Sequence, residues 1–354
     1  MEETNLKLVL RFKFCNLIKW FTQTKYFINN VDYLSYYIMK KIKLALDWTP
    51  NINHIGFFVA KEKGYFKEKG IDLKIISPDI DDYKETPAKK IELGNADFGL
   101  CPTETLISFR TKKNKFNLIA VLTIYQKDIS AIAVDNKSKI YSPKDLDNKT
   151  YASYGARYED LIIKKLIKND GGNGNINIHY PKRLGVWETV LKEKFDSTWI
   201  FLNWEGIERT NLNFFKLENY KIPYSYSPLI VTSEIFLKNT DRKIISEFIN
   251  ITKKGYIYSI NNIEDSSNIL KKYVPKDEKV DIKKSLEFSI PYFGDISKFG
   301  VMNPSVLTKF ISWLNKNQIE KLKIDANELI YNFDWKKQIK LSFKNVKKLT
   351  LCNF

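Results

Sequence analysis

The sequence is poor in the residues from which disulfide frameworks, metal sites and membrane spans are built. It contains three cysteines and two histidines in 354 residues. Cys15, Cys101 and Cys352 lie far apart and form no CxxC pair. This spacing argues against a disulfide framework or a cysteine-based metal site and fits a reducing compartment. No run of eighteen apolar residues occurs, so neither a transmembrane helix nor stable membrane insertion is expected.

A secretory signal is also missing from the start of the sequence. Basic residues interrupt the apolar positions of 1–20, so no hydrophobic region of the usual length exists there. The first convincing strand directly follows Met39, which makes Met39 a plausible start and 1–38 an N-terminal extension that need not be native. The sequence as given therefore predicts a cytoplasmic protein, whereas a different gene start would make it periplasmic or surface-located.

The one strong compositional bias is a basic excess, with a formal net charge of +17. Such a charge invites a nucleic-acid-binding interpretation. However, residues 1–40 contribute +3 and residues 335–354 contribute +6, so the two ends supply 9 of the 17 charges. The other basic residues are nearly all lysines scattered along the chain. We therefore predict a mildly basic, solvated surface and no nucleic-acid binding.

The most informative stretch that is present is 43–66, KLALDWTPNINHIGFFVAKEKGYF. It reads as a short buried strand, a polar turn at 47–54 and a helix, the unit that builds parallel α/β sheets. Ligands in such sheets bind beyond the carboxyl ends of the strands. The turn holds an acid, an indole, two amides and a histidine, so it is predicted to line a ligand site.

The same alternation continues along the chain and predicts two lobes. Residues 41–125 read βαβαβαβ, and a smaller α/β series follows, with a short helix at 185–192. Crossings near 126–133 and 222–228 would form a hinge and leave a ligand cleft between the lobes. The predicted division is lobe 1 at 39–130 and 224–334, lobe 2 at 131–223, and a Lys-rich tail at 335–354.

Six segments carry a resemblance to a known family. They are LDWTPNINHIGFFVAKEKGYFKEKGIDLKI (46–75), IELGNADFGL (91–100), SPKDLDNKTYASYGARYE (142–159), WIFLNWEGIE (199–208), IPYSYSPLIVTSEIFL (222–237) and FGVMNPSVL (299–307). With these segments the sequence resembles the type II periplasmic-binding-protein superfamily. The similar branch contains SsuA-type alkylsulfonate-binding proteins, pyrimidine-precursor-binding proteins and the yeast-type hydroxymethylpyrimidine phosphate synthase of thiamine biosynthesis. The resemblance implies a two-lobed α/β fold of mostly parallel sheets flanked by helices, with a small heteroaromatic ligand in the interlobe cleft.

The sequence departs from the synthases of this branch. Those enzymes are understood to use pyridoxal phosphate on a lysine, an active-site histidine consumed as substrate, and a cysteine-rich, iron-associated motif. Here the corresponding stretch 101–105 (CPTET) has neither lysine nor histidine, and 224–232 (YSYSPLIVT) has no cysteine. We therefore expect no catalytic residue, no metal and no cofactor. Pyridoxal phosphate and iron belong only to the synthase alternative, and the binding-protein branch implies an ABC permease as partner.

Candidate ligand contacts in the first polar turn are an indole, two amides and an imidazole. Trp48 is expected to stack on a flat heterocycle, with a lid over the sheet edge as the alternative. Asn51 and Asn53 suit ring nitrogens and amino groups, and equally suit Asx turns and helix caps. His54 precedes a helix and either donates to a ligand anion there or serves as a capping or packing residue.

A second polar turn, at the end of the strand at 97–100, contributes Thr103 and Glu104. Both are expected to face the same cleft, with free backbone N–H groups at the helix start. The alternative for Glu104 is a favourable first-turn acid of that helix. The second histidine, His179, is interpreted as structural.

The second lobe contributes two further turns. Tyr154, Gly155 and Tyr158, together with Ala156, follow a strand, and their small residues would let the backbone approach a ligand. Tyr154 could then stack opposite Trp48. The alternative is ordinary turn chemistry.

Trp204 and Glu205 form the most distinctive pair, at the end of the TWIFL strand. Glu205 would accept from the exocyclic amine of a 4-aminopyrimidine, which makes the site discriminating, and Trp204 would stack on the ring. The alternative for Glu205 is an ion pair with a lysine. Tyr224 and Tyr226 on the second crossing are further aromatic candidates. The sequence thus predicts a binder of a 4-aminopyrimidine thiamine precursor, with a synthase that makes the pyrimidine from histidine and pyridoxal phosphate as the alternative.

Overall fold

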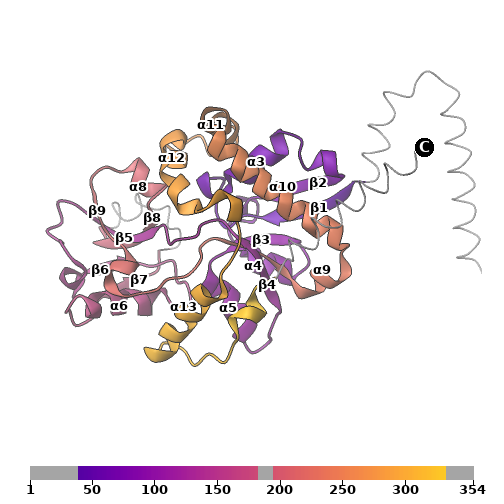
Figure 1. Ribbon diagram of the computed structural model, residues 1–354. Coiled ribbons are helices and arrows are strands. Elements are labelled where there is room, and N and C mark those ends of the chain that lie inside the picture. Colours follow the sequence, from indigo (N-terminus) through magenta and orange to yellow (C-terminus); the bar gives the residue numbers. More distant parts are fainter. Residues whose placement is uncertain (1–38, 182–193, 332–354) are drawn as a thin grey trace, which may run out of the picture.

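The computed structural model describes residues 39–181 and 194–331. The predicted N-terminal extension (1–38), the short helix at 185–192 and the Lys-rich tail (335–354) lie outside these residues. The described chain forms two five-stranded sheets that lie side by side, each with its own flanking helices (Figure 1). We refer to them as sheet A and sheet B.

Sheet A has the strand order β2-β1-β3-β10-β4. Its strands are β1 (Lys40–Ala45), β2 (Ile71–Ile76), β3 (Phe98–Cys101), β4 (Leu118–Thr123) and β10 (Leu229–Ser233). β1 pairs in parallel with both β2 and β3, whereas β10 is antiparallel to β3 and β4. Four strands therefore point in one direction and β10 points in the other.

Sheet B has the order β7-β6-β8-β5-β9 and repeats this plan. Its strands are β5 (Ser130–Asp135), β6 (Thr150–Ala152), β7 (Asn177–His179), β8 (Ser197–Phe201) and β9 (Leu212–Phe215). β6 is parallel to β7 and β8, and β5 is antiparallel to β8 and β9. The expected class of mostly parallel sheets flanked by helices is confirmed, with one reversed strand in each sheet.

Ten α-helices lie in residues 39–181 and 194–331. They are α3 (Ile55–Glu62), α4 (Pro87–Glu92), α5 (Thr103–Thr111), α6 (Glu159–Asn169), α8 (Glu205–Glu208), α9 (Glu234–Asn239), α10 (Arg242–Asn261), α11 (Ile263–Lys271), α12 (Ile282–Phe293) and α13 (Pro304–Lys316). Short 3-10 turns η1 (Ile52–His54), η2 (Lys67–Lys69), η3 (Pro78–Asp81), η4 (Pro143–Leu146), η5 (Leu217–Tyr220), η6 (Ile296–Lys298) and η7 (Ala326–Leu329) complete the list. Local chemistry explains several helix starts. Thr86 caps α4 from its side chain with Pro87 at the first position, and Asn303 caps α13 ahead of Pro304.

The chain passes between the sheets twice. It leaves sheet A after β4, enters sheet B at β5, and returns from β9 to β10. These two passages are where the sequence predicted crossings. The exact lobe boundaries remain a prediction. Later helices return to sheet A, and α10 packs along α3 on that side of the molecule (Figure 1).

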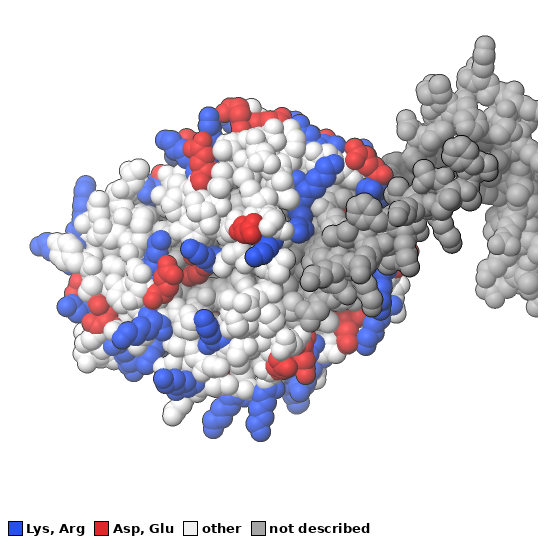
Figure 2. Space-filling view, in the orientation of Figure 1, with Lys and Arg blue, Asp and Glu red and all other residues white. Residues whose placement is uncertain are grey.

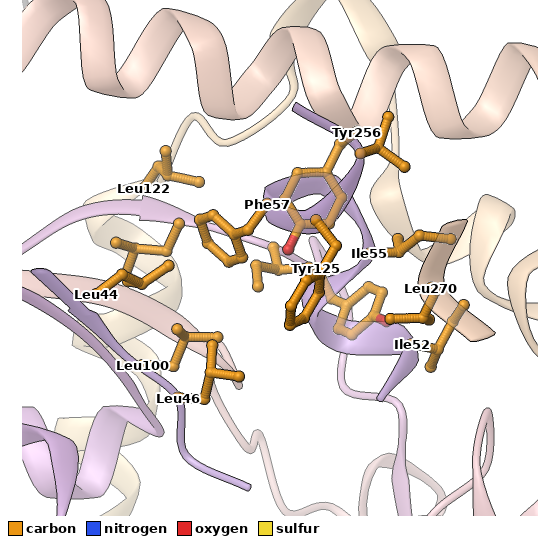
Figure 3. Close-up of a cluster of buried hydrophobic side chains, with 14 of the residues drawn as sticks. Leu44, Leu46, Ile52, Ile55, Phe57, Leu100, Leu122, Tyr125, Tyr256 and Leu270 are labelled. Atoms are coloured by element: carbon orange, nitrogen blue, oxygen red, sulfur yellow. The ribbon is translucent and has the colours of Figure 1, made fainter. Parts of the chain in front are cut away.

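Aromatic packing joins α10 to the first strand-turn-helix unit. The rings of Phe98 and Phe248 stack with centroids 3.9 Å apart. Tyr256 of α10 lies edge-on to Phe57 at 5.7 Å and stacks on Phe299 at 4.9 Å. Figure 3 shows Tyr256 and Phe57 in one cluster with Tyr125 and surrounding leucines and isoleucines. This core fixes η1 and α3, and with them the predicted ligand turn.

The surface has mixed charge. On the face shown in Figure 2, lysines and arginines are spread around the molecule with aspartates and glutamates among them. In residues 39–181 and 194–331, no helix combines the length and apolarity needed to span a bilayer.

Candidate functional site

Four strand ends place polar turns at the junction of the two sheets. In sheet A, β1 is followed by η1 and α3, and β3 by α5; in sheet B, β6 is followed by α6 and β8 by α8. Since β1 and β3 are parallel, and β6 and β8 are parallel, each pair ends at the same edge of its sheet. Three of the turns place a glutamate in the first turn of the following helix (Glu104, Glu159 and Glu205), whereas the turn after β1 carries its acid, Asp47, just after the strand.

An aromatic contact joins the two sides. Trp48, after β1, and Tyr154, after β6, have ring centroids 6.4 Å apart at an interplanar angle of 82°. Trp48 is partly buried and also contacts Tyr83, at 5.1 Å. Tyr154 is 42% exposed. The two aromatic side chains that the sequence set opposite each other therefore do meet, edge to face.

The His54 ring is fully used by its own turn. Nδ1 accepts the backbone N–H of Asn51 at 3.2 Å, so Nε2 carries the proton and donates to Asp47 Oδ1 at 2.8 Å. His54 is completely buried, while the Asp47 side chain is 27% exposed. The geometry thus matches the capping alternative for His54, and its effect is to hold the Asp47 carboxylate beside Trp48.

Asn51 also has a local role. Its side-chain oxygen accepts from the Asn53 N–H at 2.9 Å, and its amide donates to the Thr49 carbonyl at 3.2 Å. This is an Asx-type cap of η1, one of the two roles that the sequence left open.

A buried polar network around Asn53 connects the two sides behind the aromatic pair. Asn53 Oδ1 accepts from the Tyr125 hydroxyl at 2.8 Å and from the Asn203 amide at 3.0 Å. The Asn203 amide also lies 2.8 Å from the Tyr125 hydroxyl and 3.0 Å from the Ser289 hydroxyl. The Asn53 carbonyl accepts from the Tyr256 hydroxyl at 2.6 Å. Asn53 therefore belongs to a structural junction between η1, the first crossing, the end of β8 and α12.

Thr103 and Glu104 begin α5 and differ in what they contact. The Thr103 N–H and hydroxyl both donate to the Tyr226 carbonyl, at 3.2 and 2.8 Å. The expectation of a free N–H at this position is therefore wrong, because Thr103 ties α5 to the second crossing. Glu104 is 5% exposed, and its Oε2 has no hydrogen-bond partner among the described residues.

Burial raises the pKa of Glu104 to about 8, with the charge of Glu159 as the second cause, and the Tyr224 hydroxyl acts in the opposite direction. Glu159 opens α6 and is 3% exposed. It accepts from the Tyr151 hydroxyl at 2.7 Å and from the N–H groups of Tyr154 and Ala156 at 3.1 and 3.2 Å. Glu159 thus holds the 154–156 turn together.

Gly155 sits in the same turn with φ +69°, in the left-handed region. A Cβ there would meet the Tyr180 ring at 3.6 Å, which is ordinary contact. Backbone conformation, rather than close approach by the chain, is what favours glycine at this position.

Glu205 and Trp204, after β8, have different surroundings. Glu205 is 6% exposed, and its Oε2 accepts the Phe201 N–H at 2.8 Å. Burial raises the pKa of Glu205 to about 7, although backbone N–H groups act in the opposite direction. Although Tyr154 is partly exposed, burial raises its pKa, and the charge of Glu205 raises it further. Glu205 therefore interacts electrostatically with one ring of the aromatic pair. Trp204 is 5% exposed and belongs to the apolar core.

The remaining aromatic candidates, Tyr158, Tyr224 and Tyr226, contact neighbouring residues of the protein. Tyr158 is 1% exposed and its ring lies 6.5 Å from that of Phe310. Tyr224 is partly buried against Trp199 at 5.1 Å and Phe310 at 5.4 Å. The hydroxyl of the buried Tyr226 accepts from the Asn303 N–H at 2.9 Å. His179, on the largely exposed strand β7, lies beside Phe195 with ring centroids 5.1 Å apart.

Three residues of this region were not among the sequence candidates: Asp47, Glu159 and Asn203. The sequence held a signal for both acids. Asp47 closely follows the first strand, and Glu159 is a first-turn helix acid, as Glu104 and Glu205 are. Nothing local distinguishes Asn203, whose partners lie 78, 86 and 150 positions away.

Comparison with known proteins places the chain in a family. A family model described as NMT1/THI5 like matches residues 51–266. The chain belongs to the NMT1/THI5-like family. The formylaminopyrimidine-binding protein of Halalkalibacterium halodurans is 22% identical over 243 residues, which cover 66% of this chain and 70% of the relative. The 4-amino-5-hydroxymethyl-2-methylpyrimidine phosphate synthase of Legionella pneumophila is 20% identical over 264 residues, 72% of this chain and 81% of the relative.

A yeast relative is more similar over a shorter region. The synthase THI11 of Saccharomyces cerevisiae is 41% identical over 160 residues, 44% of this chain and 45% of the relative. Among solved structures, the alkanesulfonate-binding protein SsuA from Xanthomonas axonopodis pv. citri superposes with a TM-score of 0.60 at 10% identity, covering 82% of this chain and 98% of SsuA. This similarity confirms the two-lobed periplasmic-binding-protein fold. The family model and the named relatives confirm the resemblance found in the sequence.

The residues at the site do not fit the pyridoxal phosphate and iron of the synthases. Positions 101–105 offer no amine for a Schiff base, and Lys90, the buried lysine of the described chain, lies on α4 and is paired with Asp81 and the Glu85 carbonyl. Residues 39–181 and 194–331 contain no group of three or more His, Cys, Asp or Glu side chains that could hold a metal ion.

Proposed function

We propose that this protein binds a small 4-aminopyrimidine, a precursor of thiamine, between its two lobes. The observation that carries the proposal is the contact between Trp48 and Tyr154, which follow strands of different sheets and have ring centroids 6.4 Å apart. The charge of the buried Glu205 carboxyl raises the pKa of Tyr154, so an acceptor acts on the same ring. A flat ring taken between two aromatic side chains gains both apolar burial and stacking. The formylaminopyrimidine-binding relative supports a ligand of this class.

Each side chain has a defined task in this proposal. Trp48 and Tyr154 move apart by domain opening and close on the two faces of the ring. Glu205 accepts a hydrogen bond from the exocyclic amine. Asp47, held by His54, is a second acceptor at the edge of the ring. The junction of Asn53 with Asn203 keeps the lobes in register behind the ligand. The turns of Thr103, Gly155 and Tyr158, the cap of Asn51, the core residue Trp204 and the hinge residue Tyr224 support the walls.

The test is direct binding of 4-amino-5-hydroxymethyl-2-methylpyrimidine, measured by calorimetry and by the shift in melting temperature. At pH 8, above the Glu205 pKa of about 7, Glu205→Gln should weaken binding roughly 10–100-fold, because a hydrogen bond to a charged group contributes about 1.5–3 kcal/mol. The glutamine keeps an oxygen that can accept the Phe201 N–H, so the fold should survive. Glu208→Gln, in the same helix, is the matched control and should bind as the wild type does.

Trp48→Ala should weaken binding by a similar factor, since it removes one stacking face. The proposal fails if aminopyrimidines neither release heat on mixing nor raise the melting temperature. It also fails if Glu205→Gln and Trp48→Ala bind as tightly as Glu208→Gln.

The synthase alternative rests on the names of several relatives, including the yeast protein that is 41% identical over 160 residues. It requires an absorption band when pyridoxal phosphate is added, and loss of that band on a Lys→Ala substitution. We favour binding without a cofactor because 101–105 lacks the lysine. In the binding interpretation an ABC permease is the partner, with lobe 1 formed by 39–130 and 224–334 and lobe 2 by 131–223.

A further inference from the structure

Glu104 is a buried carboxyl without a use in the ring-binding scheme. It lies in the first turn of the nine-residue helix α5, is 5% exposed, and has an Oε2 with no hydrogen-bond partner in the described chain. Leaving such an oxygen unpaired costs about 1–3 kcal/mol, and more for a charged group. A buried polar atom of this kind calls for an explanation, and a ligand that donates to it is one.

Glu159 begins α6 in sheet B, and Arg157, just before it, hydrogen-bonds to Ser108 and Thr111 on α5, the helix that carries Glu104. The charge of Glu159 raises the pKa of Glu104, and the two carboxyls differ in their hydrogen-bond donors. Glu159 accepts three hydrogen bonds, from the Tyr151 hydroxyl and from the N–H groups of Tyr154 and Ala156. These donors stabilise its charged form. Glu104 has no comparable set of donors. A shared proton in this pair therefore resides on Glu104.

The groups around Glu104 bring no positive charge. Those that interact with it electrostatically are Glu159 on α6, Asp128 on the first crossing, Tyr224 on the second, Tyr158 before α6 and Cys101 before α5. Within residues 39–181 and 194–331, neither Glu104 nor Glu159 forms an ion pair. Arg157 is nearby in sequence but is paired with Glu320 and hydrogen-bonded to Ser108 and Thr111.

We propose that Glu104 and Glu159 form a subsite for an ammonium group carried by the ligand. The subsite rests on the proposed binding of an aminopyrimidine and specifies its substituent: a ring with a positively charged aminomethyl arm, and no phosphate. An ammonium group donates to the unpaired Glu104 Oε2 and places a cation between two carboxylates from opposite lobes. A phosphate ester would bring further negative charge to the same place and is excluded by repulsion.

Binding of such a cation is linked to proton release. The pKa of Glu104 is about 8, raised by burial and then by Glu159, so the free protein holds a proton there at pH 7. An ammonium ligand favours the ionised carboxylate and displaces that proton. Affinity for the cation should therefore rise between pH 6.5 and 8.5, whereas affinity for a neutral ring should change less.

Two ligands that differ in one group test the subsite: 4-amino-5-aminomethyl-2-methylpyrimidine and 4-amino-5-hydroxymethyl-2-methylpyrimidine. We expect the aminomethyl compound to bind the wild type at least about 10-fold more tightly at pH 8, as a charge-assisted hydrogen bond allows. Calorimetry in two buffers of different ionisation enthalpy should show a proton release approaching one per aminomethyl ligand at pH 7. The phosphate ester of the hydroxymethyl compound should not bind.

Glu104→Gln should abolish the preference and the proton release that the aminomethyl compound shows in excess of the hydroxymethyl compound, while retaining binding of the hydroxymethyl compound. The control is Glu234→Gln, a first-turn glutamate of α9 whose partner is the surface residue Lys238, and it should behave as the wild type does. If the Glu104 variant fails to fold, the difference in proton release between the two compounds in the wild type decides.

The outcomes separate the two proposals. Equal affinities and equal proton release for both compounds would overturn the ammonium subsite and leave aminopyrimidine binding intact. Tight binding of the phosphate ester would also overturn the subsite. If none of the three compounds binds, the proposed function itself is wrong, and the subsite falls with it.

Discussion

The close packing of α10 on α3 supports the ligand turn, and one added methyl group should disrupt it. In α10, a Cβ built on Gly255 would lie 2.0 Å from the Gly56 carbonyl oxygen and 2.9 Å from Ala60 Cβ, both in α3. Because the obstructing oxygen is backbone, a rotamer change cannot relieve the contact, and α3 must move away from α10 by an ångström or more to restore normal contact.

The expected cost of Gly255→Ala follows from two opposing effects. Overpacking a well-packed core costs typically about 1–3 kcal/mol, and a backbone obstacle places this case at the upper end. Alanine in a helix interior recovers up to about 1 kcal/mol relative to glycine. The net destabilisation should therefore be about 2 kcal/mol. The next residue, Tyr256, donates to the Asn53 carbonyl at 2.6 Å, so the shift should also displace the ligand turn and weaken ligand binding.

Urea unfolding followed by circular dichroism measures this cost, with calorimetry for the ligand. Asn250→Ala is the matched control, because Asn250 is an exposed residue of α10. It receives a similar but smaller gain in helix propensity without a new contact and loses only a 3.5 Å hydrogen bond to Ser246, so it should be about as stable as the wild type. A Gly255→Ala protein with the unfolding midpoint of the Asn250→Ala control would refute the close approach of α3 and α10.

Three further substitutions or conditions test the same region. Tyr256→Phe removes the donor to the buried Asn53 carbonyl and should lower the free energy of unfolding by about 1–3 kcal/mol in urea titrations; no change would contradict this anchor. Asn203→Leu removes three side-chain contacts at the sheet junction, and X-ray scattering should report a larger radius of gyration, whereas an unchanged radius would deny it a role in holding the lobes together. Because folding raises the carboxyl pKa of Glu104 to about 8, its stabilisation is complete below pH 4.5 and lost as pH rises through 8. Unfolding midpoints should thus fall from pH 5 to pH 8, and less so in Glu104→Gln; an equal fall in both proteins would reject this assignment.

Much of the fold could be predicted because its information is local. The strand, turn and helix at 43–66 are marked by apolar residues, a polar interruption and a renewed apolar run, and the structure has β1, η1 and α3 there. Thr86 with Pro87 and Asn303 with Pro304 mark helix starts locally, since caps and first-position prolines act within one turn. Both passages of the chain between the sheets were also predicted from local sequence.

The roles of individual polar side chains were less accessible because they depend on distant partners. Tyr154 was expected to stack opposite Trp48, and the two rings meet edge to face; their stacking on a ligand stays a prediction. By contrast, whether Asn53 contacts a ligand or a neighbour depended on Tyr125 and Asn203, from two other parts of the chain. For His54 the deciding partner, Asp47, was only seven residues away, but the two are brought together by the bend of η1, which residue spacing does not specify.

The distribution of charge at the junction connects ligand binding to the contact between the lobes. Arg157 of the second lobe bonds to Ser108 and Thr111 on α5 and pairs with Glu320, and Trp48 meets Tyr154. These contacts favour approach of the lobes. Burial of Glu104 and the charge of Glu159 both raise the pKa of Glu104, so this approach is opposed whenever Glu104 is ionised. A cation between the two carboxylates would remove that opposition, whereas a neutral ring would not. Lobe closure in this protein should therefore respond to the charge of the ligand as well as to its shape.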